Sequence, residues 1–269
     1  MGEALAEFRI GAAQRLLGVD LDEARDVDED EEEVAEFVLD AIVRGGIHDG
    51  FELGAFFIVA TKIGGHVFGA YDGARMVAFC IGLPGIKHQS PHSSVTASSY
   101  IHSHMLGVLA GYRDYGIGRM LKLKQREEAL WQGVDLIEWT FDPLELKNAY
   151  FNIERLGCIV RRFVRNQYGA SSSQLQAGLP TDRCTAEWWI SSDRVTNLLA
   201  GTPIQPPPVE ARIAIPATID DIKRRDLPRA RALQAEASDK FLQYFEQGLA
   251  VIGFERNEAN GTYLLGKYS

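Results

Sequence analysis

The sequence predicts an α/β fold, an α+β mixed sheet covered by helices. Short segments rich in β-forming residues at 65–71 and 76–83 meet at Asp72-Gly73, which is typical of a tight turn between antiparallel strands. Strand and helix patterns then alternate between residues 100 and 168, which favours a parallel pair inside the same sheet. The composition, 46% hydrophobic and 24% charged, is that of an ordinary globular protein.

The N-terminal part predicts a solvated acidic segment followed by a helix. Residues 20–33 carry most of the excess negative charge and lead into apolar residues at helical spacing over 34–43. Gly45-Gly46 is a typical helix stop. Residues 56–61 are rich in β-formers and predict the first strand, whereas the polar residues 87–99 predict a loop.

The central elements follow from the spacing of their apolar residues. We expect strands at 100–109, 136–141, 159–168 and 186–191, and helices at 117–131 and about 144–156. Together with the elements before them, they define one domain over residues 1–203.

The C-terminal part is predicted to be an appendage. A Pro-rich linker at 204–208 precedes residues 209–269, whose pattern predicts a strand at 212–219, a helix at 227–247, and strands at 250–254 and 262–267. About 60 residues make a marginal independent core, so we expect this segment to pack on the main domain or on a partner subunit. A homodimer is left open by this pattern.

Charge and cysteine content exclude several classes of protein. The net charge of −9 argues against nucleic-acid binding, which needs a basic surface. No run approaches the roughly 20 apolar residues of a membrane span, and the first 17 residues lack the basic region and uninterrupted apolar stretch of a secretion signal. The three cysteines, Cys80, Cys158 and Cys184, have neither disulfide-framework nor metal-ligand spacing. We therefore expect a cytoplasmic protein without a metal.

The segment between the strand at 100–109 and the helix at 117–131 carries the strongest functional signal. It reads Arg113-Asp114-Tyr115-Gly116-Ile117-Gly118, followed by Arg119. Two glycines allow close approach of the backbone, and the free amides at a helix N-terminus favour an anion, so the segment predicts a pyrophosphate site. It is neither a Walker loop nor a dinucleotide-binding GxGxxG motif, because no Gly-Lys-Ser/Thr follows and Leu121 fills the third glycine position.

This segment resembles the [RQ]xxGx[GA] motif of the GNAT acyltransferase superfamily. Leu106-Gly107-Val108, separated from Arg113 by four residues, reproduces the strand-to-loop spacing, and Leu156-Gly157-Cys158 is similar to the "LGF" that ends the next helix. The string SHMLGV…GIGRMLKLKQRE…WTFDPLELKNAYFN resembles a poorly characterised subfamily of predicted acetyltransferases. The resemblance covers roughly residues 50 to 195.

The resemblance implies acetyl-CoA or another acyl-CoA as cosubstrate, and a GNAT fold that presents it. The main chain of Leu106 and Val108 would bind the pantetheine arm, and Asn148 or Asn152 would line the cleft. The pyrophosphate would be held by Arg113, Asp114, Tyr115, Gly116, Ile117, Gly118 and Arg119. The family commonly has a tyrosine as general acid five residues before the Phe of "LGF", where this sequence has Ile153.

Four residues are candidates for moving protons. His102 and His104 alternate along one strand and would share a face, where they could relay a proton from the amine; the alternative is a hydrogen-bonded structural pair. Glu138 could act as a base or form a surface salt bridge. Tyr150, one helical turn before Ile153, is the nearest substitute acid, although a helix tyrosine commonly serves packing.

The sequence thus predicts an N-acyltransferase that moves an acetyl or larger acyl group, such as succinyl, to the amine of a small metabolite such as an amino acid. Two alternatives remain at this stage. The departure at Ile153 is compatible with a non-catalytic CoA-binding module, and an open groove would suit a protein or peptide amine.

Overall fold

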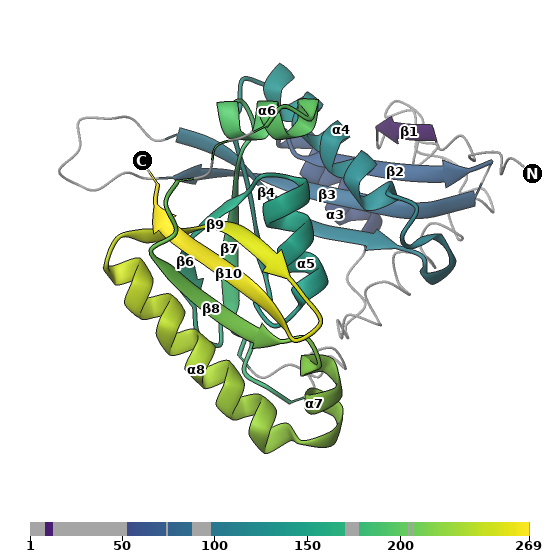
Figure 1. Ribbon diagram of the computed structural model, residues 1–269. Helices are drawn as coiled ribbons and strands as arrows, with labels where there is room; N and C mark the ends of the chain where they lie inside the picture. Colours follow the sequence, from purple (N-terminus) through teal and green to yellow (C-terminus); the bar gives the residue numbers. More distant parts are fainter. Residues whose placement is uncertain are drawn as a thin grey trace, which may run out of the picture. The chain divides into compact units, whose positions relative to one another are not determined.

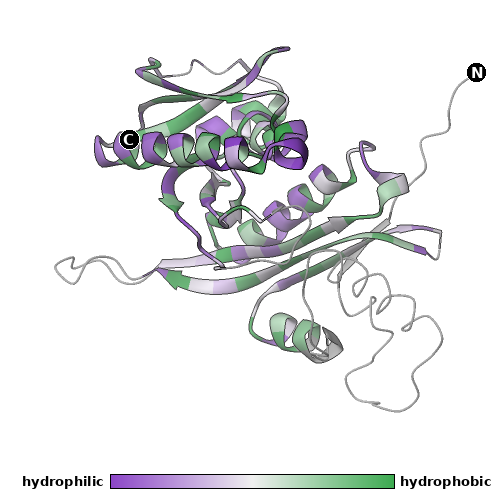
Figure 2. Ribbon diagram, turned by 90° about the horizontal axis from the view of Figure 1, so that it is seen from below, coloured by the Kyte–Doolittle hydropathy of each residue, from purple (hydrophilic) through white to green (hydrophobic). Residues whose placement is uncertain are grey.

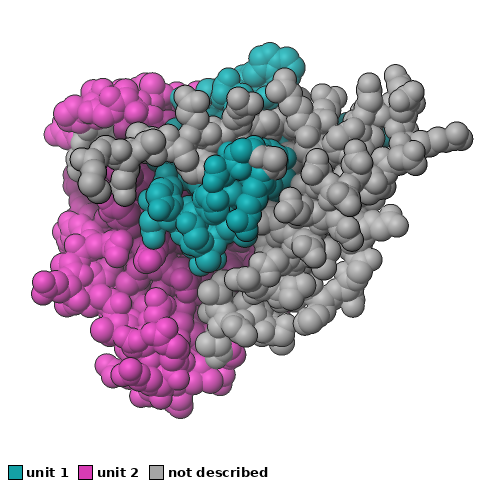
Figure 3. Space-filling view, turned by 90° about the vertical axis from the view of Figure 1, so that its right-hand side faces the viewer, with its two compact units in different colours: residues 1–137 teal, residues 138–269 magenta. Residues whose placement is uncertain are grey.

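The computed structural model describes residues 9–12, 53–73, 75–87, 98–169, 178–203, 205 and 207–268. The acidic segment at 20–33, the helix at 34–43, most of the loop at 87–99 and part of the 204–208 linker lie outside the described residues. The chain divides into two compact units, residues 1–137 and 138–269, coloured separately in Figure 3. The described residues form strands of a mixed sheet together with helices, so the predicted class, an α+β mixed sheet with helices, is confirmed (Figure 1).

The strands of the first unit lie in the order β1-β2-β3-β4. They are β1 (Arg9–Ala12), β2 (His66–Asp72), β3 (Arg75–Lys87) and β4 (Ser98–Val108), and each pairs antiparallel with the next. The β2–β3 hairpin confirms the predicted turn, where Gly73 has φ +63°, a conformation that favours glycine.

Two helices cover opposite faces of this sheet. The helix α3 (Leu53–Lys62) packs Phe57 against Phe79 and Ile81. The helix α4 (Ile117–Trp131) packs on the other face, where Ile117 and Leu121 join a cluster formed by residues Phe68, Ala70, Val77, Ala78 and Cys80. A 3₁₀ turn, η1 (Ala110–Tyr112), connects β4 to the segment before α4.

The prediction of a strand at 56–61 is wrong, because these residues belong to α3. A short run of apolar residues fits a buried strand and a buried helix equally well by composition. The hydroxyl of Thr61 donates to the Phe57 carbonyl at 3.1 Å, a bond to the preceding turn that only the helical backbone brings into reach.

The strands of the second unit lie in the order β5-β7-β6-β9-β10-β8. Their bounds are β5 (Leu136–Phe141, which begins at the unit boundary), β6 (Ile159–Val164), β7 (Arg183–Trp189), β8 (Ala211–Pro216), β9 (Leu249–Arg256) and β10 (Asn260–Lys267). The helices are α5 (Leu146–Tyr150), continued as the π-helix η2 (Phe151–Arg155), then α6 (Asp193–Ala200), α7 (Ile219–Arg225) and α8 (Leu227–Glu246).

Residues 209–269 contribute three strands and the longest helix of this unit. Val251 of β9 pairs with Val160 of β6, so these strands continue the sheet begun by β5, β7 and β6. The ring of Phe241 on α8 stacks on Phe163, with centroids 5.5 Å apart, and meets Tyr263 edge-on at 5.1 Å. Hydrophobic and hydrophilic residues alternate along α8, as a helix with one face on a sheet requires (Figure 2).

No helix in the described part of the chain combines the length and the apolar character needed to cross a membrane.

Candidate functional site

A β-bulge at His104 determines which side chains of β4 face which helix. Ser103 pairs with Gly82 and Met105 pairs with Ile81, so His104 is an extra residue with no partner on β3. Such an insertion reverses the alternation of side chains beyond it. His104 and Met105 consequently both lie on the α3 face, although they are consecutive in sequence.

The two histidines lie side by side on the α3 face. Their ring centroids are 6.1 Å apart, and the ring of Phe56 from α3 lies 6.1 Å from that of His104. The side chain of His104 remains exposed, yet partial burial against its neighbours lowers its pKa from 6.5. A neutral imidazole at pH 7 is therefore available there, as a general base requires.

Beyond the bulge, Leu106 and Val108 turn to the opposite face, toward α4. A Cβ placed on Gly118 of α4 would lie 3.6 Å from Leu106 and 4.0 Å from Val108. The Leu109 amide donates to the Val77 carbonyl at 3.0 Å, so the peptide groups of Leu106 and Val108, three and one residues earlier, point away from β3. This is the orientation that the predicted pantetheine contact needs.

The segment between η1 and α4 holds its amides in an unusual backbone conformation. Asp114 and Gly116 have φ values of +68° and +79°, and Gly116 lies directly before the helix. No side chain caps this end, and the first bond of the helix runs from the Met120 amide to the Gly116 carbonyl at 3.1 Å. The amides of the first turn, Ile117, Gly118 and Arg119, are thus the groups that an anion would meet.

The side chains around this segment fit an anionic ligand. Among the described residues, Nε of Arg119 is buried and has no hydrogen-bond partner. A buried donor without a partner is uncommon in proteins, and a water molecule or a ligand can supply its acceptor. The Nε of Arg113 donates to the Val108 carbonyl at 3.3 Å, and the side chain of Tyr115 is 68% exposed. Tyr112 anchors the start of the segment by donating to Asp72 at 2.8 Å.

The predicted site residues of the second unit differ in exposure and in their contacts with other side chains. Asn148 and Tyr150 are exposed, and the Arg256 guanidinium lies 5.6 Å from the centre of the Tyr150 ring. Asn152 is buried, and its side-chain oxygen accepts from the Trp139 indole at 3.3 Å. Ile153 is fully buried. Asn148 therefore has its whole amide available for a ligand, whereas Asn152 also binds within the core.

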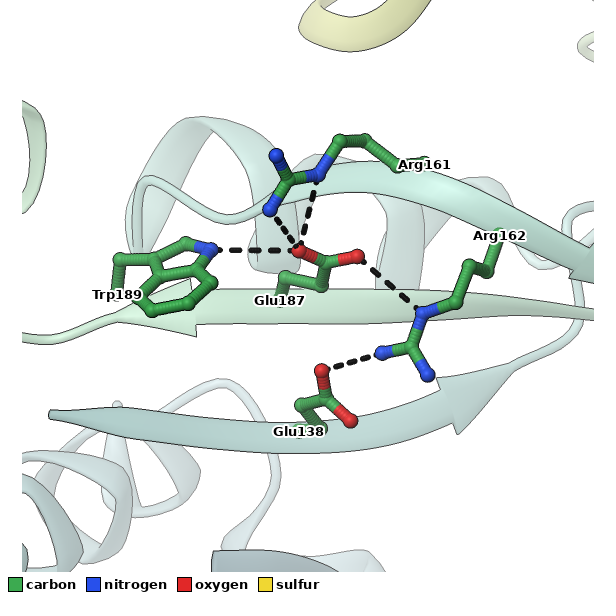
Figure 4. Close-up of polar contacts among 5 residues, drawn as sticks. All are labelled: Glu138, Arg161, Arg162, Glu187 and Trp189. Carbon is green, nitrogen blue, oxygen red and sulfur yellow. Dashed lines mark hydrogen bonds and ion pairs between the residues drawn. The ribbon is translucent and has the colours of Figure 1, made fainter. Parts of the chain in front are cut away.

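Glu138 belongs to a chain of ion pairs across three strands (Figure 4). Its carboxylate pairs with Arg162 of β6, whose Nε also donates to Glu187 of β7 at 3.3 Å. The second oxygen of Glu187 accepts from Arg161 at 2.6 Å and from the Trp189 indole at 3.3 Å. Both carboxylates are only 3% exposed, so their charges are balanced by the two arginines rather than by water.

A second bulge brings both arginines to this face. Val160 pairs with Ala186 and Arg162 with Thr185, which leaves Arg161 as the extra residue. Burial raises the pKa of the Glu187 carboxyl, but the hydrogen bonds and charges of Arg161 and Arg162 outweigh that effect and leave it below its usual value. Glu138 could act as a base only by giving up this pairing.

The bulges at His104 and Arg161 are not predicted from the sequence, because strict alternation places neighbouring residues of a strand on opposite faces. Arg161 and Arg162 then seem unable to share Glu187, and Leu106 and Val108 seem to share a face with the histidines. The only signal was the pair of consecutive arginines within a strand pattern. The three cysteines are buried and free, and the described residues contain no group of three His, Cys, Asp or Glu side chains placed for a metal.

No family model matches the chain, and no curated protein matches it. Several solved structures are similar. An N-acetyltransferase from Staphylococcus aureus is 14% identical with a TM-score of 0.48, covering 69% of this chain and 99% of that one. NAA60 of Arabidopsis thaliana, solved with a bisubstrate analogue, is 15% identical with a TM-score of 0.47, covering 61% and 95%.

A GNAT-family acetyltransferase from Streptococcus pneumoniae is 12% identical with a TM-score of 0.44, covering 67% of this chain and 98% of that one. These TM-scores are below 0.5, so the function proposed below rests on this chain's own residues.

Proposed function

We propose that this protein is an acyl-CoA-dependent N-acyltransferase, which moves an acetyl or larger acyl group from CoA to an amine. The observation that carries the proposal is the segment from Arg113 to Arg119. It combines left-handed backbone at Gly116, uncapped amides at the start of α4 and the unpartnered Nε of Arg119. These features fit a pyrophosphate, which is doubly negative and accepts several hydrogen bonds.

The neighbouring strand supports a thioester donor rather than a nucleotide alone. The peptide groups of Leu106 and Val108 point away from β3 and could bind an extended amide chain such as pantetheine. The open space at Gly118 agrees with this, because only Leu106 and Val108 would meet a Cβ there, at ordinary contact distance. Packing against the described residues does not require a glycine here, which supports the close approach of a ligand.

The imidazoles of His102 and His104 supply the base. An amine acceptor is mostly protonated at neutral pH, and a neutral imidazole can remove that proton directly or through water. The free amine then attacks the thioester carbonyl carbon and forms the carbon–nitrogen bond, and the nitrogen loses its extra proton to solvent. The carbon–sulfur bond breaks, and the sulfur leaves as a thiolate that takes up a proton from solvent or Tyr150. We propose the Val108 amide as the donor to the developing oxyanion.

The acceptor we favour is a small metabolite such as an amino acid. A protein or peptide amine is the second candidate, and a CoA-binding module without activity is the third. The buried Ile153, at the position of the family's general acid, is what the third candidate rests on. A thiolate is a good leaving group, so an acid is helpful rather than essential for the transfer.

Two measurements test the proposal. Calorimetry with CoA should give one site per chain, and release of free thiol from acetyl-CoA or succinyl-CoA should depend on the amine in a panel of amino acids, polyamines and short peptides. No affinity for CoA would refute the donor site. Binding of CoA without turnover on any amine would favour the inactive module instead.

A further inference from the structure

The second unit contains a cavity of about 530 Å³ between η2, the end of α6 and the β9–β10 pair. All of its lining residues belong to that unit, and the segment at Arg113–Arg119 does not contribute. Its volume lies within the range of roughly 300–1,000 Å³ that is usual for small-molecule sites. Its walls include Glu154, Arg194, Leu198, Pro203, Ile252 and Leu264.

The cavity holds one carboxylate and one guanidinium that form no ion pair among the residues the structure describes. The carboxylate of Glu154 accepts from the Phe254 amide at 2.7 Å. Arg194 donates to the carbonyls of Gly157 and Ile252 at 2.9 and 2.8 Å. Neither forms an ion pair with any described residue, whereas Glu255, also in the wall, is already paired with Arg212 at 2.8 Å. Within the described part of the chain, the cavity therefore has one charge of each sign without an ion-pair partner.

The fold anchors these two charges on the same strand. Ile252 is the extra residue of a bulge in β9, since Leu264 pairs with Gly253 and Leu265 with Val251, and its carbonyl accepts from Arg194. The Phe254 amide that binds Glu154 lies two residues farther along β9. Both charged side chains are therefore held by the backbone of one wall of the cavity.

From this arrangement we propose that the cavity binds a zwitterionic α-amino acid with an aliphatic side chain. Its carboxylate would pair with Arg194 and its ammonium group with Glu154, while Leu198, Pro203 and Leu264 would contact the side chain. Charge-assisted bonds to both ends would select the zwitterion over an amine or an acid alone. The site is independent of the proposed acyl transfer and would remain if CoA did not bind.

The test uses the full-length protein and calorimetry with L-leucine, 3-methylbutylamine and 4-methylpentanoate. L-leucine is expected to bind at least ten-fold more tightly than either analogue, which each lack one charged group. Glu154→Gln keeps an oxygen for the Phe254 amide, so it should fold normally and weaken L-leucine about ten-fold without affecting 4-methylpentanoate. Glu255→Gln is the matched control and should leave all three affinities unchanged, because Arg212 already neutralises that carboxylate.

A second variant, Leu198→Trp, tests the cavity independently of the substitution at Glu154. Leu198→Trp fills the cavity from α6 without touching the carbonyl contacts of Arg194, and it should abolish binding while thermal unfolding stays cooperative. Equal affinity for L-leucine and its one-charge analogues, or unchanged binding in both Glu154→Gln and Leu198→Trp, would overturn the proposal. CoA affinity measured on the same variants should be unchanged, which separates this site from the proposed donor site.

Discussion

The imidazole rings of His102 and His104 lie 6.1 Å apart on the α3 face of β4, at a bulge that gives His104 no partner on β3. The same bulge turns Leu106 and Val108 to the α4 face. One irregularity therefore places the imidazoles on one face of the strand and the side chains of Leu106 and Val108 on the other, while the peptide groups proposed to contact the thioester lie along the strand edge between the two faces.

Replacing both histidines by alanine should lower the acylation rate at pH 7 by about 100-fold, the low end of general-base contributions. In the wild type, the rate should fall as the pH decreases through a midpoint below 6.5, because burial lowers the pKa of His104 and only the neutral ring accepts a proton. The pH dependence of kcat/KM in wild type, His102→Ala and His104→Ala assigns this midpoint. An identical profile in the double variant would remove the histidines from the mechanism.

Substitutions at the two glycines of the anion-binding segment should separate stability from binding. Gly118→Ala places its Cβ at ordinary contact distance, so the free energy of unfolding should be unchanged while CoA affinity drops at least ten-fold. Gly116→Ala forces φ +79° on a residue with a side chain and should cost about 1 kcal/mol of stability. Calorimetry and denaturant unfolding of both variants measure the two effects. Normal CoA affinity in Gly118→Ala would contradict the proposed approach of the ligand.

Removing Arg162 should destabilise the second unit, because Glu138 and Glu187 would lose a shared partner while only 3% exposed. We expect Arg162→Met to cost about 2 kcal/mol at pH 7, less than a fully buried pair because the arginine is half exposed. Arg165→Met, which breaks an exposed pair with Asp239, is the control and should cost under about 1 kcal/mol.

The ion pairs that Arg161 and Arg162 form with Glu187 predict a contribution to stability that is lost in acid. The pKa of Glu187 is lowered in the folded protein, so on acidification the unfolded chain takes up a proton first. The stabilisation is therefore full above the ordinary carboxyl pKa and is lost as the pH falls through the lowered value. Urea unfolding from pH 7 to pH 3 should show a smaller acid-side loss for Arg162→Met than for wild type. If the free energy of unfolding fell equally with pH in wild type and Arg162→Met, the ion pairs of Arg162 would not be the source of the acid sensitivity.

Lys223 of α7 should be needed to hold residues 209–269 in place. Its ammonium group lies 2.8 Å from Glu145 and 3.6 Å from Asp142, and both Lys223 and Asp142 are buried. Lys223→Met leaves the Asp142 carboxylate without its cation and should cost about 3 kcal/mol, measured by denaturant unfolding. Arg224→Met, on the same helix but paired at the surface, should be nearly neutral; an equal loss in both would point to a general effect on α7.

The elements that the sequence predicted well are those with a long and clear periodicity. The helix at 117–131 and the strand at 136–141 have the predicted bounds, and the long C-terminal helix differs by one residue. The strand predicted at 56–61 is a helix instead, because five apolar residues and a threonine are too few to distinguish the two periods. The short helices α6 and α7 were missed, since each offers only two turns of pattern.

The candidate site was predictable in composition but not in geometry. The glycines and arginines at 113–119 identify an anion site because their chemistry depends on residue type. The faces of Leu106, Val108 and Arg161 depend on two single-residue bulges, which no alternation pattern reveals. Glu138 resembled an exposed strand carboxylate in sequence, and its pairing with Arg162 depends on strand order.

The bulge in β4 also makes this strand unusually tolerant of shortening. Because Ser103 and Met105 already oppose the adjacent residues Gly82 and Ile81, excising His104 would leave a continuous ladder with every other pairing retained. Deletion of the His104 codon would thus remove one imidazole, and every neighbouring side chain of β4 would stay on its present face of the sheet. Homologues with and without this codon would form a natural comparison of chemistry on an otherwise identical scaffold.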